Sequence, residues 1–472
     1  MERVDVAVIG GGTAGLTVAQ LAAAAGKRVM LAEPGRLGGE CTWTGCVPSK
    51  ALIETARLRH QISRAGTFGL TVGDATVDFP AVMARLRRVM DTIGSYEDAA
   101  YLEARGIAVH QVPARLTGPH HVELAGETIE AEHIVVCTGN KPAIPSIPGL
   151  ADTPYLTNET LFSLERLPMH LIIAGAGIIG MEMGQAFGRL GSAVTIIDEA
   201  DTVLAHEDWD IQRLAQEILA SEGVNFRLGQ TITEVQAGSG EFALTLRTGE
   251  QVSGDALLIA TGRQAHTDGL GLESAGVQIP ERGIQVDEHM RTSVEHIYAA
   301  GDVTGLYPFT HVAAYQARVA AANILGKRSK VEYRVVPWAI FTDPPIGHVG
   351  LTEGEARAQH RDIHVTTLPY SAIDRAVIED ETAGIIKVIA NRRSVVGWMG
   401  GGEILGAHLI GAGADNLIHE FVLAMQTRSF TGRIAQALHA YPSMAMGDQM
   451  AVGLLFPGGK VTIDLREELR SK

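Results

Sequence analysis

A glycine pattern that occurs twice constrains the fold of this chain more than any other feature. The first copy follows the apolar run VDVAVIG and consists of Gly10, Gly12 and Gly15. A helical segment and a second apolar run follow, and Glu33 ends that run eighteen positions after the last glycine. In such a strand, turn, helix and strand, the glycines allow a tight turn, close approach to a pyrophosphate and close helix packing. Because the acid can accept from ribose hydroxyls, the pattern predicts a dinucleotide site.

The second copy lies in LIIAGAGIIG and consists of Gly175, Gly177 and Gly180. Asp198 ends the run AVTIID eighteen positions after the last of these glycines. One glycine fingerprint is weak evidence, because ordinary turns between a strand and a helix also match it. Two copies, each with its acid, favour two dinucleotide sites. The sequence therefore predicts an α/β fold with two Rossmann-like domains.

Composition narrows the class of protein. A length of 472 residues predicts about two to four domains, and 46% hydrophobic residues describe a globular chain. The net charge of −15 argues against nucleic acid as a partner. The N-terminus shows no signal-peptide pattern, so we expect a cytoplasmic protein. The most apolar stretch, 171–187, contains Glu182 and is short and rich in glycine, so no membrane span is predicted.

Apolar strands that end in turn residues divide the rest of the chain. The strand in HIVVCTGNKPAIPSIPGL leads into a proline-rich connector, which predicts a domain boundary near residue 150. A strand at 256–264 ends in Thr-Gly, and one at 296–305 ends in Gly-Asp, where folds of this kind bind ligands. From about residue 336, strands such as AGIIKVIA and SVVGWMG (394–400) with helical segments predict an α+β domain.

Two of the three cysteines, Cys41 and Cys46, lie five positions apart in GGECTWTGCVPSK. In a reducing compartment, a close pair is more often catalytic or metal-binding than structural. A zinc site needs about four ligands at short spacings, and the chain has no second pair, so no metal site is predicted. Cys137 lies inside an apolar strand, where a thiol is usually a small buried hydrophobic group.

The pair can form a reversible disulfide only with a particular backbone. Residues five apart on an ideal helix lie about 140° apart, so Cys41 must lie in a distorted segment before the helix. Gly45 supplies backbone freedom, and Pro48 is tolerated in a first helical turn. At a helix N-terminus, the dipole favours the thiolate that does the chemistry.

These motifs, with AAGDV and FTDPPIGHVGLTE (341–353), closely resemble the class I pyridine nucleotide-disulfide oxidoreductases over essentially the whole chain. Dihydrolipoamide dehydrogenase, glutathione reductase and mercuric reductase belong to that family. The resemblance implies two Rossmann-like domains, which bind FAD and NAD, and a C-terminal α+β domain that forms a homodimer with shared active sites. It assigns FAD binding to 1–150 and 266–335, NAD(P) binding to 151–265, and dimerisation to 336–472.

The resemblance also implies roles for single residues. Cys46 would face the flavin and form a thiolate-to-flavin charge-transfer complex, and Cys41 would exchange with the acceptor. Lys50 resembles the lysine beside flavin N5, paired with a glutamate at the position of Glu182, although alone each would more often be a solvated charge. The implied FAD contacts are Gly10, Gly12, Gly15, Glu33, Lys50, Thr138, Gly139, Asp302 and Thr310, and the implied NAD contacts are Gly175, Gly177, Gly180, Glu182, Asp198 and Gly262.

The end of the strand at Asp198 indicates which nicotinamide cofactor is used. An acid there accepts from the 2′-hydroxyl of NADH, whereas NADPH sites carry arginines that meet the 2′-phosphate. The stretch IIDEAD holds three acids and no arginine. The sequence favours NADH over NADPH.

The C-terminal stretch LHAYPSMAMGDQ departs from the family. A histidine before proline and a glutamate five residues later act there as acid and base, which typically contributes ~10²–10⁴-fold. Here Tyr441 precedes Pro442, and Met446 replaces the glutamate. Tyrosine is a poor base for a thiol, but it can donate a hydrogen bond or lie beside a metal ion. His439 could share a face with Tyr441 in an extended segment and replace the base, or it could be an interface histidine.

Three functions follow from this pattern. The first is an NADH-linked flavoenzyme that passes electrons through Cys41–Cys46 to a small disulfide or dithiol. The second is a reductase of metal ions, as in mercuric reductases, or of quinones. Mercuric reductases, however, carry a C-terminal cysteine pair and prefer NADPH, and this chain ends in VTIDLREELRSK. The third is a redox sensor or docking flavoprotein with little turnover.

Overall fold

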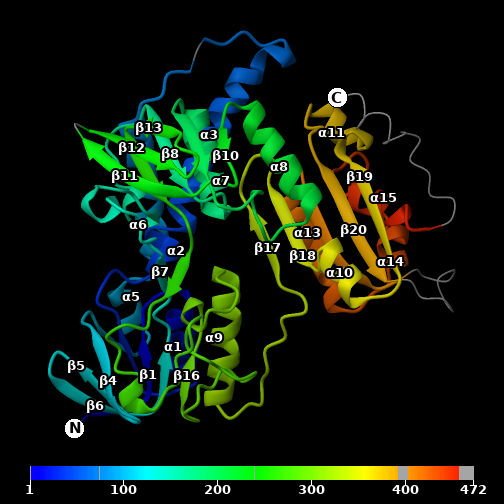
Figure 1. The fold of residues 1–472 in the computed structure, drawn as a ribbon. Coiled ribbons are helices and arrows are strands. Elements are labelled where there is room, and N and C mark those ends of the chain that lie inside the picture. Colours follow the sequence, from blue (N-terminus) through cyan, green and yellow to red (C-terminus); the bar gives the residue numbers. More distant parts are fainter. Residues whose placement is uncertain (1, 74, 239, 392–401, 457–472) are drawn as a thin grey trace. The chain divides into compact units, whose positions relative to one another are not determined.

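The computed structural model describes residues 2–73, 75–238, 240–391 and 402–456. The chain forms two compact units. The first comprises Met1–Gly175, Arg189–Ala193 and Thr231–Glu332. The second comprises Ala176–Gly188, Val194–Gln230 and Tyr333–Lys472. The fold is of the mixed α/β class that the sequence predicts (Figure 1).

A seven-stranded sheet forms the core of the first unit. Its central strand β1 (Glu2–Ile9) runs parallel to β2 (Val29–Ala32) on one side and to β6 (Glu127–Val136) on the other. Helix α1 (Thr13–Ala24) connects β1 to β2, which confirms the predicted strand, turn, helix and strand. The remaining strands are β3 (Ile107–His110) beside β2, β16 (Ile297–Ala299) parallel to β6, and the antiparallel β5 (His121–Leu124) and β4 (Ala114–Gly118).

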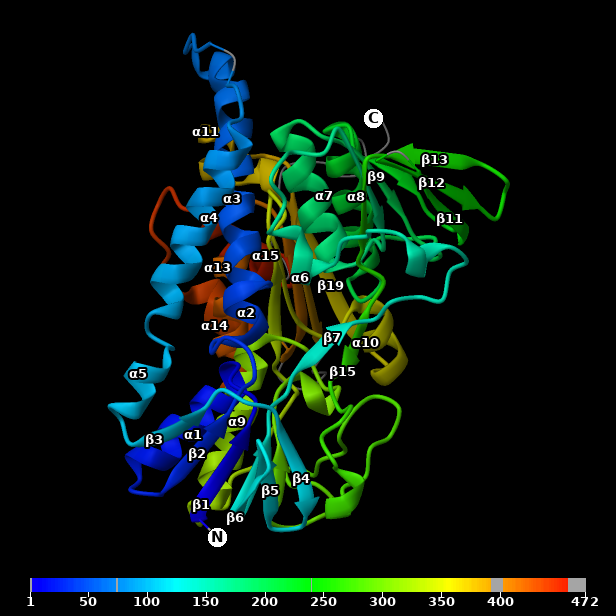
Figure 2. The same cartoon turned by 90° about the vertical axis from the view of Figure 1, so that its left-hand side faces the viewer.

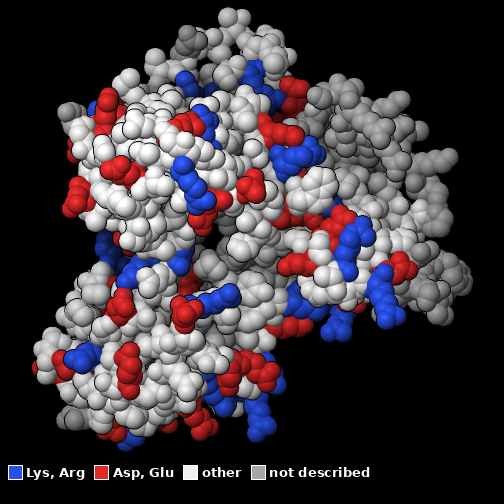
Figure 3. All heavy atoms as spheres, viewed as in Figure 1, with Lys and Arg blue, Asp and Glu red and all other residues white. Residues whose placement is uncertain are grey.

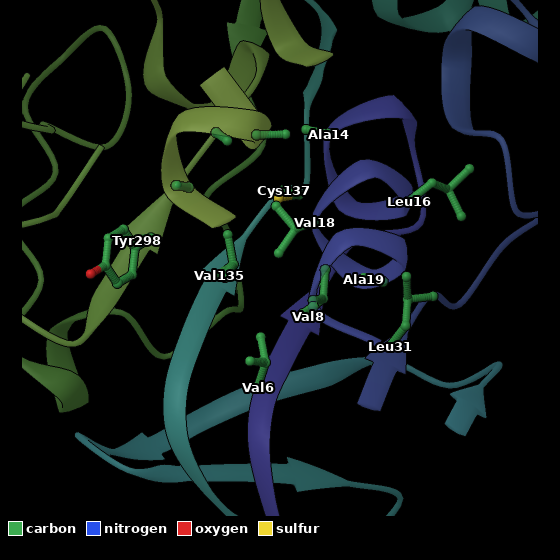
Figure 4. Packing of buried hydrophobic residues seen from close by; sticks show 14 of the residues in the cluster. Val6, Val8, Ala14, Leu16, Val18, Ala19, Leu31, Val135, Cys137 and Tyr298 are labelled. Carbon is green, nitrogen blue, oxygen red and sulfur yellow. The ribbon is translucent and has the colours of Figure 1, made fainter. Parts of the chain in front are cut away.

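The central strand is apolar because both of its faces are covered. Val6 and Val8 point into one core cluster, with α1 and α9 (Thr310–Ile324), and Ala7 and Ile9 belong to a cluster on the other face. Figure 4 shows Val8 near Val18 and Ala19 of α1, in the same cluster as Val6 and as Cys137, which follows β6. Parallel strands buried on both faces read as such continuous apolar runs.

Small side chains let α9 pack closely on α1. Both helices contribute several buried alanines to one cluster, namely Ala14, Ala19, Ala22, Ala313, Ala317 and Ala320. The two helices lie side by side in both ribbon views (Figures 1 and 2). The position of the α9 N-terminus therefore depends on a seam of alanines.

The other elements of the first unit carry the site described below. The short helix α2 (Gly39–Trp43) carries Cys41, and α6 (Asn158–Leu161) contacts α2 through the hydrogen bond from Asn158 to Glu40. The long α3 (Cys46–Arg64) packs on α4 (Phe79–Gly94), as Figure 2 shows. The other strands are β8 (His170–Ala174) parallel to β14 (Ala256–Ile259), β7 (Asn140–Pro142) paired with β15 (Arg263–Ala265), and the sheet β11 (Ile232–Gly238), β12 (Glu241–Leu246) and β13 (Gln251–Gly254).

The second unit holds a five-stranded antiparallel sheet. Its order is β17 (Pro337–Ile340), β18 (Ile346–Gly350), β21 (Ile404–Ile410), β20 (Ile385–Asn391) and β19 (Ile363–Pro369). Its other elements are α7 (Ile178–Leu190), β9 (Ala193–Ile197), α8 (Trp209–Ser221), β10 (Asn225–Arg227), α10 (Glu353–Gln359), α11 (Asp374–Ile378), α13 (Ala414–Gln426), α14 (Thr431–Gln436) and α15 (Met446–Gly453). The predicted α+β character from residue 336 is confirmed, whereas the predicted strand at 394–400 lies outside the described residues.

Two further observations concern the surface and the membrane prediction. On the face drawn in Figure 3, acidic and basic side chains are interspersed. Within the described part of the chain, every helix is too short or too polar to cross a bilayer.

A buried lysine joins three segments of the second unit. Lys387 on β20 is 1% exposed, and its Nζ donates to Asp208, Asp210 and Glu353 at 2.7 Å each. Burial alone would lower the pKa of Lys387, but its hydrogen bonds to the three carboxylates outweigh burial and raise that pKa. All three ammonium protons are therefore used, which fixes the start of α8 and of α10 against the sheet.

Replacing Lys387 should destabilise the second unit strongly. Lys387→Met leaves the buried carboxylates without their cation, and removal of one partner of a buried pair costs about 3–5 kcal/mol. We expect a loss of that size in chemical denaturation followed by tryptophan fluorescence. The matched control is Lys330→Met, because Lys330 pairs with Glu288 while more than half exposed. Exposed pairs contribute about 0–1 kcal/mol, so equal losses in the two variants would contradict this account.

Candidate active site

In the first glycine turn, neighbouring backbone atoms leave no room for a side chain at two of the three glycines. The third glycine faces free space. A Cβ on Gly10, which has φ +105°, would lie 2.3 Å from the carbonyl oxygen of Cys137. One on Gly15 would lie 1.9 Å from the oxygen of Gly10, so backbone contacts exclude side chains at both positions. At Gly12 the nearest atom would be Gly39 Cα at 3.8 Å. The free space lies where a pyrophosphate needs close approach, so the turn fits a dinucleotide.

The second turn is built in the same way. A Cβ on Gly175, with φ +114°, would lie 2.3 Å from the carbonyl oxygen of Ala260. The residues whose oxygens make these contacts directly precede the two Thr-Gly turns of the sequence, Thr138-Gly139 and Thr261-Gly262. Each fingerprint turn therefore lies beside one Thr-Gly turn. Gly177 and Gly180 fall at the start of α7, as the pattern predicts.

The two acids of the glycine fingerprints, Glu33 and Asp198, accept hydrogen bonds from the backbone of the glycine turns that precede them. Glu33 accepts hydrogen bonds from the backbone N–H of Gly11 and of Gly35, both at 2.8 Å. Asp198 repeats this arrangement with the N–H of Ala176 at 2.6 Å and of Ala200 at 2.8 Å. Each carboxylate oxygen keeps a lone pair with which to accept from a ribose hydroxyl. The acids therefore combine the predicted ligand contact with a structural role that the spacing alone does not reveal.

The cysteine motif is hydrogen-bonded to the first turn. The N–H of Gly38 donates to the oxygen of Gly11 at 2.8 Å, and a Cβ on Gly39 would lie 2.7 Å from Gly12 Cα. Cys41 lies in the separate short helix α2, and Cys46 is the first residue of α3 after Gly45. The prediction that Cys41 lies before the helix of Cys46 is confirmed, but the segment that holds Cys41 is a short α-helix rather than a distorted one. The hydrogen bond from Gly38 places the motif beside the first glycine turn.

Two helix N-termini meet at Cys46. Its Sγ lies 3.5 Å from the hydroxyl of Thr310, which begins α9 as Cys46 begins α3. The positive ends of both helix dipoles and a hydroxyl donor favour a negative charge on this sulfur. Thr310 was expected only as a flavin contact, and its position beside the cysteine comes from the structure.

The two cysteine sulfurs differ in their surroundings. Cys46 is exposed and Cys41 is partly buried. A hydrogen bond to Cys46, together with burial, raises the pKa of the Cys41 thiol. Cys41 therefore holds its proton more tightly than an isolated thiol does. The third cysteine, Cys137, is buried as predicted, and burial raises its pKa to about 12.

A polar network that the sequence did not predict adjoins the cysteines. Arg263 pairs with Glu40 and donates to Asn158 at 2.6 Å and to Asn140 at 2.9 Å. Asn158 also donates to Glu40 at 3.0 Å, and Asn140 donates to Asp302 at 2.9 Å. Burial raises the pKa of Glu40 to about 7, against the opposing charge of Arg263, and burial raises that of Asp302 to about 6. In the sequence, the one indication of this network was the acid Glu40 directly before Cys41.

The C-terminal residues lie in two different environments. Tyr441 is 70% exposed and donates its hydroxyl proton to Asp374 at 2.9 Å. Met446, at the start of α15, lines a small pocket of about 120 Å³ with Pro442, Met450 and neighbouring residues. Met446 thus gives this pocket an apolar side chain beside the polar Asp374, Arg375 and Ser443.

His439 is partly buried and fully hydrogen-bonded. Its Nε2 lies 3.1 Å from Glu420 and its Nδ1 lies 3.0 Å from the oxygen of Ala437, with the side chain 8% exposed. Burial lowers the pKa of His439, but the bonds to Glu420 and Ala437 outweigh this effect and raise it. His439 and Tyr441 therefore engage different partners rather than one shared face. A role for His439 as base stays a prediction.

The remaining predicted residues occupy suitable elements. Lys50 lies one turn after Cys46 on α3, and Glu182 on α7 is 3% exposed and accepts from the N–H of Phe341 at 2.8 Å. Their pairing stays a prediction. Thr138 donates to the oxygen of His266 at 2.7 Å, and Gly139 and Gly262 have φ of +69° and +149°.

Comparison with known proteins gives matches along most of the chain. Residues 4–317 match the family described as pyridine nucleotide-disulphide oxidoreductase, and residues 336–451 match the dimerisation domain of that family. Dihydrolipoyl dehydrogenase of Chlamydia muridarum is 34% identical over 450 residues, covering 94% of this chain and 95% of that protein. Mercuric reductase of Streptomyces lividans is 35% identical over 461 residues, covering 95% of each.

Two solved structures are also similar along nearly the whole chain. The HOCl-induced flavoprotein disulfide reductase RclA from Escherichia coli, in a Cu(II) complex, has a TM-score of 0.86 at 30% identity, covering 96% of this chain and 100% of that one. LpdA from Mycobacterium tuberculosis has a TM-score of 0.87 at 29% identity, covering 97% and 100%.

Neutralising Glu40 should change the pH dependence of stability. The pKa of Glu40 is about 7 in the folded protein and near 4.5 in the unfolded chain. Both states hold the proton below about pH 4, but above neutrality the folded protein must accommodate a charge that burial disfavours. Glu40→Gln should therefore match the wild type in thermal melts near pH 4 and melt higher near pH 8. Glu54→Gln is the control, because Arg57 lowers the pKa of Glu54 and no gain at pH 8 is expected. A gain that is equal at both pH values would refute the assignment.

Proposed function

The chain belongs to the pyridine nucleotide-disulphide oxidoreductase family, and on that premise we propose that it carries electrons from NADH through FAD to Cys41–Cys46 and on to a small disulfide or dithiol. Bound FAD would supply the two-electron transfer between the nicotinamide and the disulfide. The open space at Gly12 and the acids Glu33 and Asp302 fit this cofactor.

The surroundings of Cys46 carry the proposal. Reduction of the disulfide by two electrons and one proton breaks the S–S bond and leaves one thiolate and one thiol. The two helix N-termini and the Thr310 hydroxyl stabilise the thiolate on Cys46, and Cys41 keeps the proton. Cys41 is then the thiol that attacks the acceptor after it loses its proton.

That deprotonation step is where this chain departs from the pattern that the family resemblance implies. Tyr441 donates to Asp374, which raises its pKa, so even less of the phenolate that could accept a proton is present than for a free tyrosine. Met446 has no acid or base function. This observation favours a second candidate function, the reduction of a metal ion or a quinone, because such acceptors need no proton transfer from a substrate thiol.

NADH is the proposed nicotinamide cofactor. The carboxylate of Asp198 is fixed by two backbone N–H groups at the end of β9, and Glu199 and Asp201 follow it. Three acids would repel a 2′-phosphate, whereas a fixed carboxylate can accept from a 2′-hydroxyl.

We also propose a homodimer in the cytoplasm. The C-terminal match to a dimerisation domain supports the assembly. Three cysteines in 472 residues are too few for a disulfide-stapled secreted scaffold, which favours a reducing compartment. In such a dimer, Tyr441 would serve the active site of the partner subunit, as the family resemblance implies.

A panel of acceptors tests the reaction. Steady-state oxidation of NADH and of NADPH would be followed with lipoamide, glutathione disulfide, a quinone, Hg(II) and Cu(II). Turnover with a disulfide supports the first function, and turnover only with quinone or metal ions supports the second. Rapid flavin reduction without turnover on any acceptor would instead indicate a redox sensor. Higher kcat/KM with NADPH would overturn the choice of nucleotide.

The two cysteines should differ in a spectroscopic test. The reduced protein should show long-wavelength absorbance from a thiolate beside the flavin. This absorbance should persist in Cys41→Ser, because Cys46 remains as donor, and vanish in Cys46→Ser. Cys137→Ser is the control and should leave the band unchanged, since Cys137 is buried. Equal loss in Cys41→Ser and Cys46→Ser would disprove the assignment.

Restoring the family's acid and base should restore dithiol chemistry. Tyr441→His with Met446→Glu should raise turnover of dihydrolipoamide about ten-fold or more, within the ~10²–10⁴-fold that a positioned acid or base contributes. Reduction of the flavin by NADH should not change, because that step involves neither residue. Robust dihydrolipoamide turnover in the wild type that is lost in His439→Ala would show that His439 is the base after all.

A further inference from the structure

Three buried side chains of the second unit form a cluster of potential metal ligands. None of the three belongs to the cysteine motif or to the sites predicted from the sequence. They are Glu207, which precedes α8, His348 on β18 and His408 on β21. One potential ligand atom of each lies within 4.8 Å of the other two. The histidines are direct partners across the antiparallel strands, so both side chains leave the same face of the sheet. Their exposed fractions are 5%, 1% and 0%.

One polar atom of each of the three side chains makes a hydrogen bond to a group outside the cluster. Nε2 of His348 lies 3.1 Å from the oxygen of Gly350, and Nε2 of His408 lies 2.9 Å from that of Leu351. Oε1 of Glu207 accepts from the indole N–H of Trp338 at 2.5 Å. Histidines that bind metals almost always donate their second N–H to a carbonyl or carboxylate in this way, which fixes the tautomer and the ring orientation.

The atoms that these three hydrogen bonds leave over are Nδ1 of each histidine and Oε2 of Glu207. These are the atoms that could bind a common ion. Nδ1 of His348 lies 2.9 Å from Oε2 of Glu207, so a proton can bridge that pair. Nδ1 of His408, in contrast, is buried without a hydrogen-bond partner among the described residues. An ion pair between Glu207 and His348 therefore accounts for only two of the three groups. A buried polar atom without a partner costs free energy. The ion pair therefore gives no reason for the position of His408.

We propose that Glu207, His348 and His408 bind one divalent transition-metal ion of the zinc type as a structural site. Two neutral imidazoles and a carboxylate are a ligand set that zinc accepts. The ion would replace the proton between His348 and Glu207 and would give His408 Nδ1 a partner. It would join β18 and β21 to the segment before α8. One coordination position is left to a non-protein ligand.

Metal content of the FAD-bound protein tests the site. Because the ligands are buried, the metal must enter during folding, so the chain would be expressed in medium with Zn(II) or with Co(II) and purified without a metal-affinity tag. We expect about one zinc per chain by elemental analysis. The cobalt form should show visible d–d bands without the near-ultraviolet bands of thiolate ligation.

Variants locate the ion. Glu207→Gln and His408→Gln should lower the metal content at least about ten-fold. His364→Gln, on β19 of the same sheet, is the matched control and should retain the metal. The double variant Cys41→Ser, Cys46→Ser should also retain it, and metal lost there would place the ion at the cysteines and overturn the proposal. FAD content reports whether each variant has folded.

Two results on the wild type need no variant. Less than about one tenth of a metal ion per chain in FAD-replete protein from both media would overturn the proposal. Thiolate bands in the cobalt form would overturn it as well, because the site contains no sulfur.

Discussion

Contact between backbone atoms at two glycines is the constraint on which the rest of the structure depends. Gly10 lies against the carbonyl of Cys137, and Gly175 lies against that of Ala260, each at a distance that no side chain could enter. In the first copy, this contact joins the end of β6 to the glycine turn that follows β1. The glycine turn, the Thr138-Gly139 turn and Glu33 therefore lie together at the carboxyl ends of the parallel strands. The cysteine motif is then hydrogen-bonded to the first of these turns. The proposed passage of electrons between a cofactor and the cysteines depends on that adjacency.

The elements that the sequence predicted well are those with local causes. The start of a helix at Cys46 follows from Gly45 and Pro48, and the opening strand, turn and helix follow from apolar runs with glycines between them. The burial of Cys137 follows from its apolar neighbours. In each case the residues that decide the structure lie within a few positions of the residue in question.

The parts that the sequence could not predict depend on distant partners. Thr310 is 264 positions from Cys46, and Arg263 is 223 positions from Glu40, so no spacing relates them. His348 and His408 are neighbours only because β18 and β21 pair in one particular register. The C-terminal departure from the family was visible as Tyr441 and Met446, but the partner Asp374 and the engagement of His439 by Glu420 required the fold.

The alanine seam between α1 and α9 has an electrochemical consequence. Thr310 stands at the beginning of α9, and the separation of α9 from α1 is set by methyl groups that touch across the seam. A larger side chain at Ala317 would push the helices apart and carry the hydroxyl and the helix dipole away from Cys46. The surroundings of that sulfur therefore depend on steric volume among the alanines of a cluster in which neither cysteine of the motif takes part. A substitution made only for its effect on packing would then also change the polar contact at Cys46.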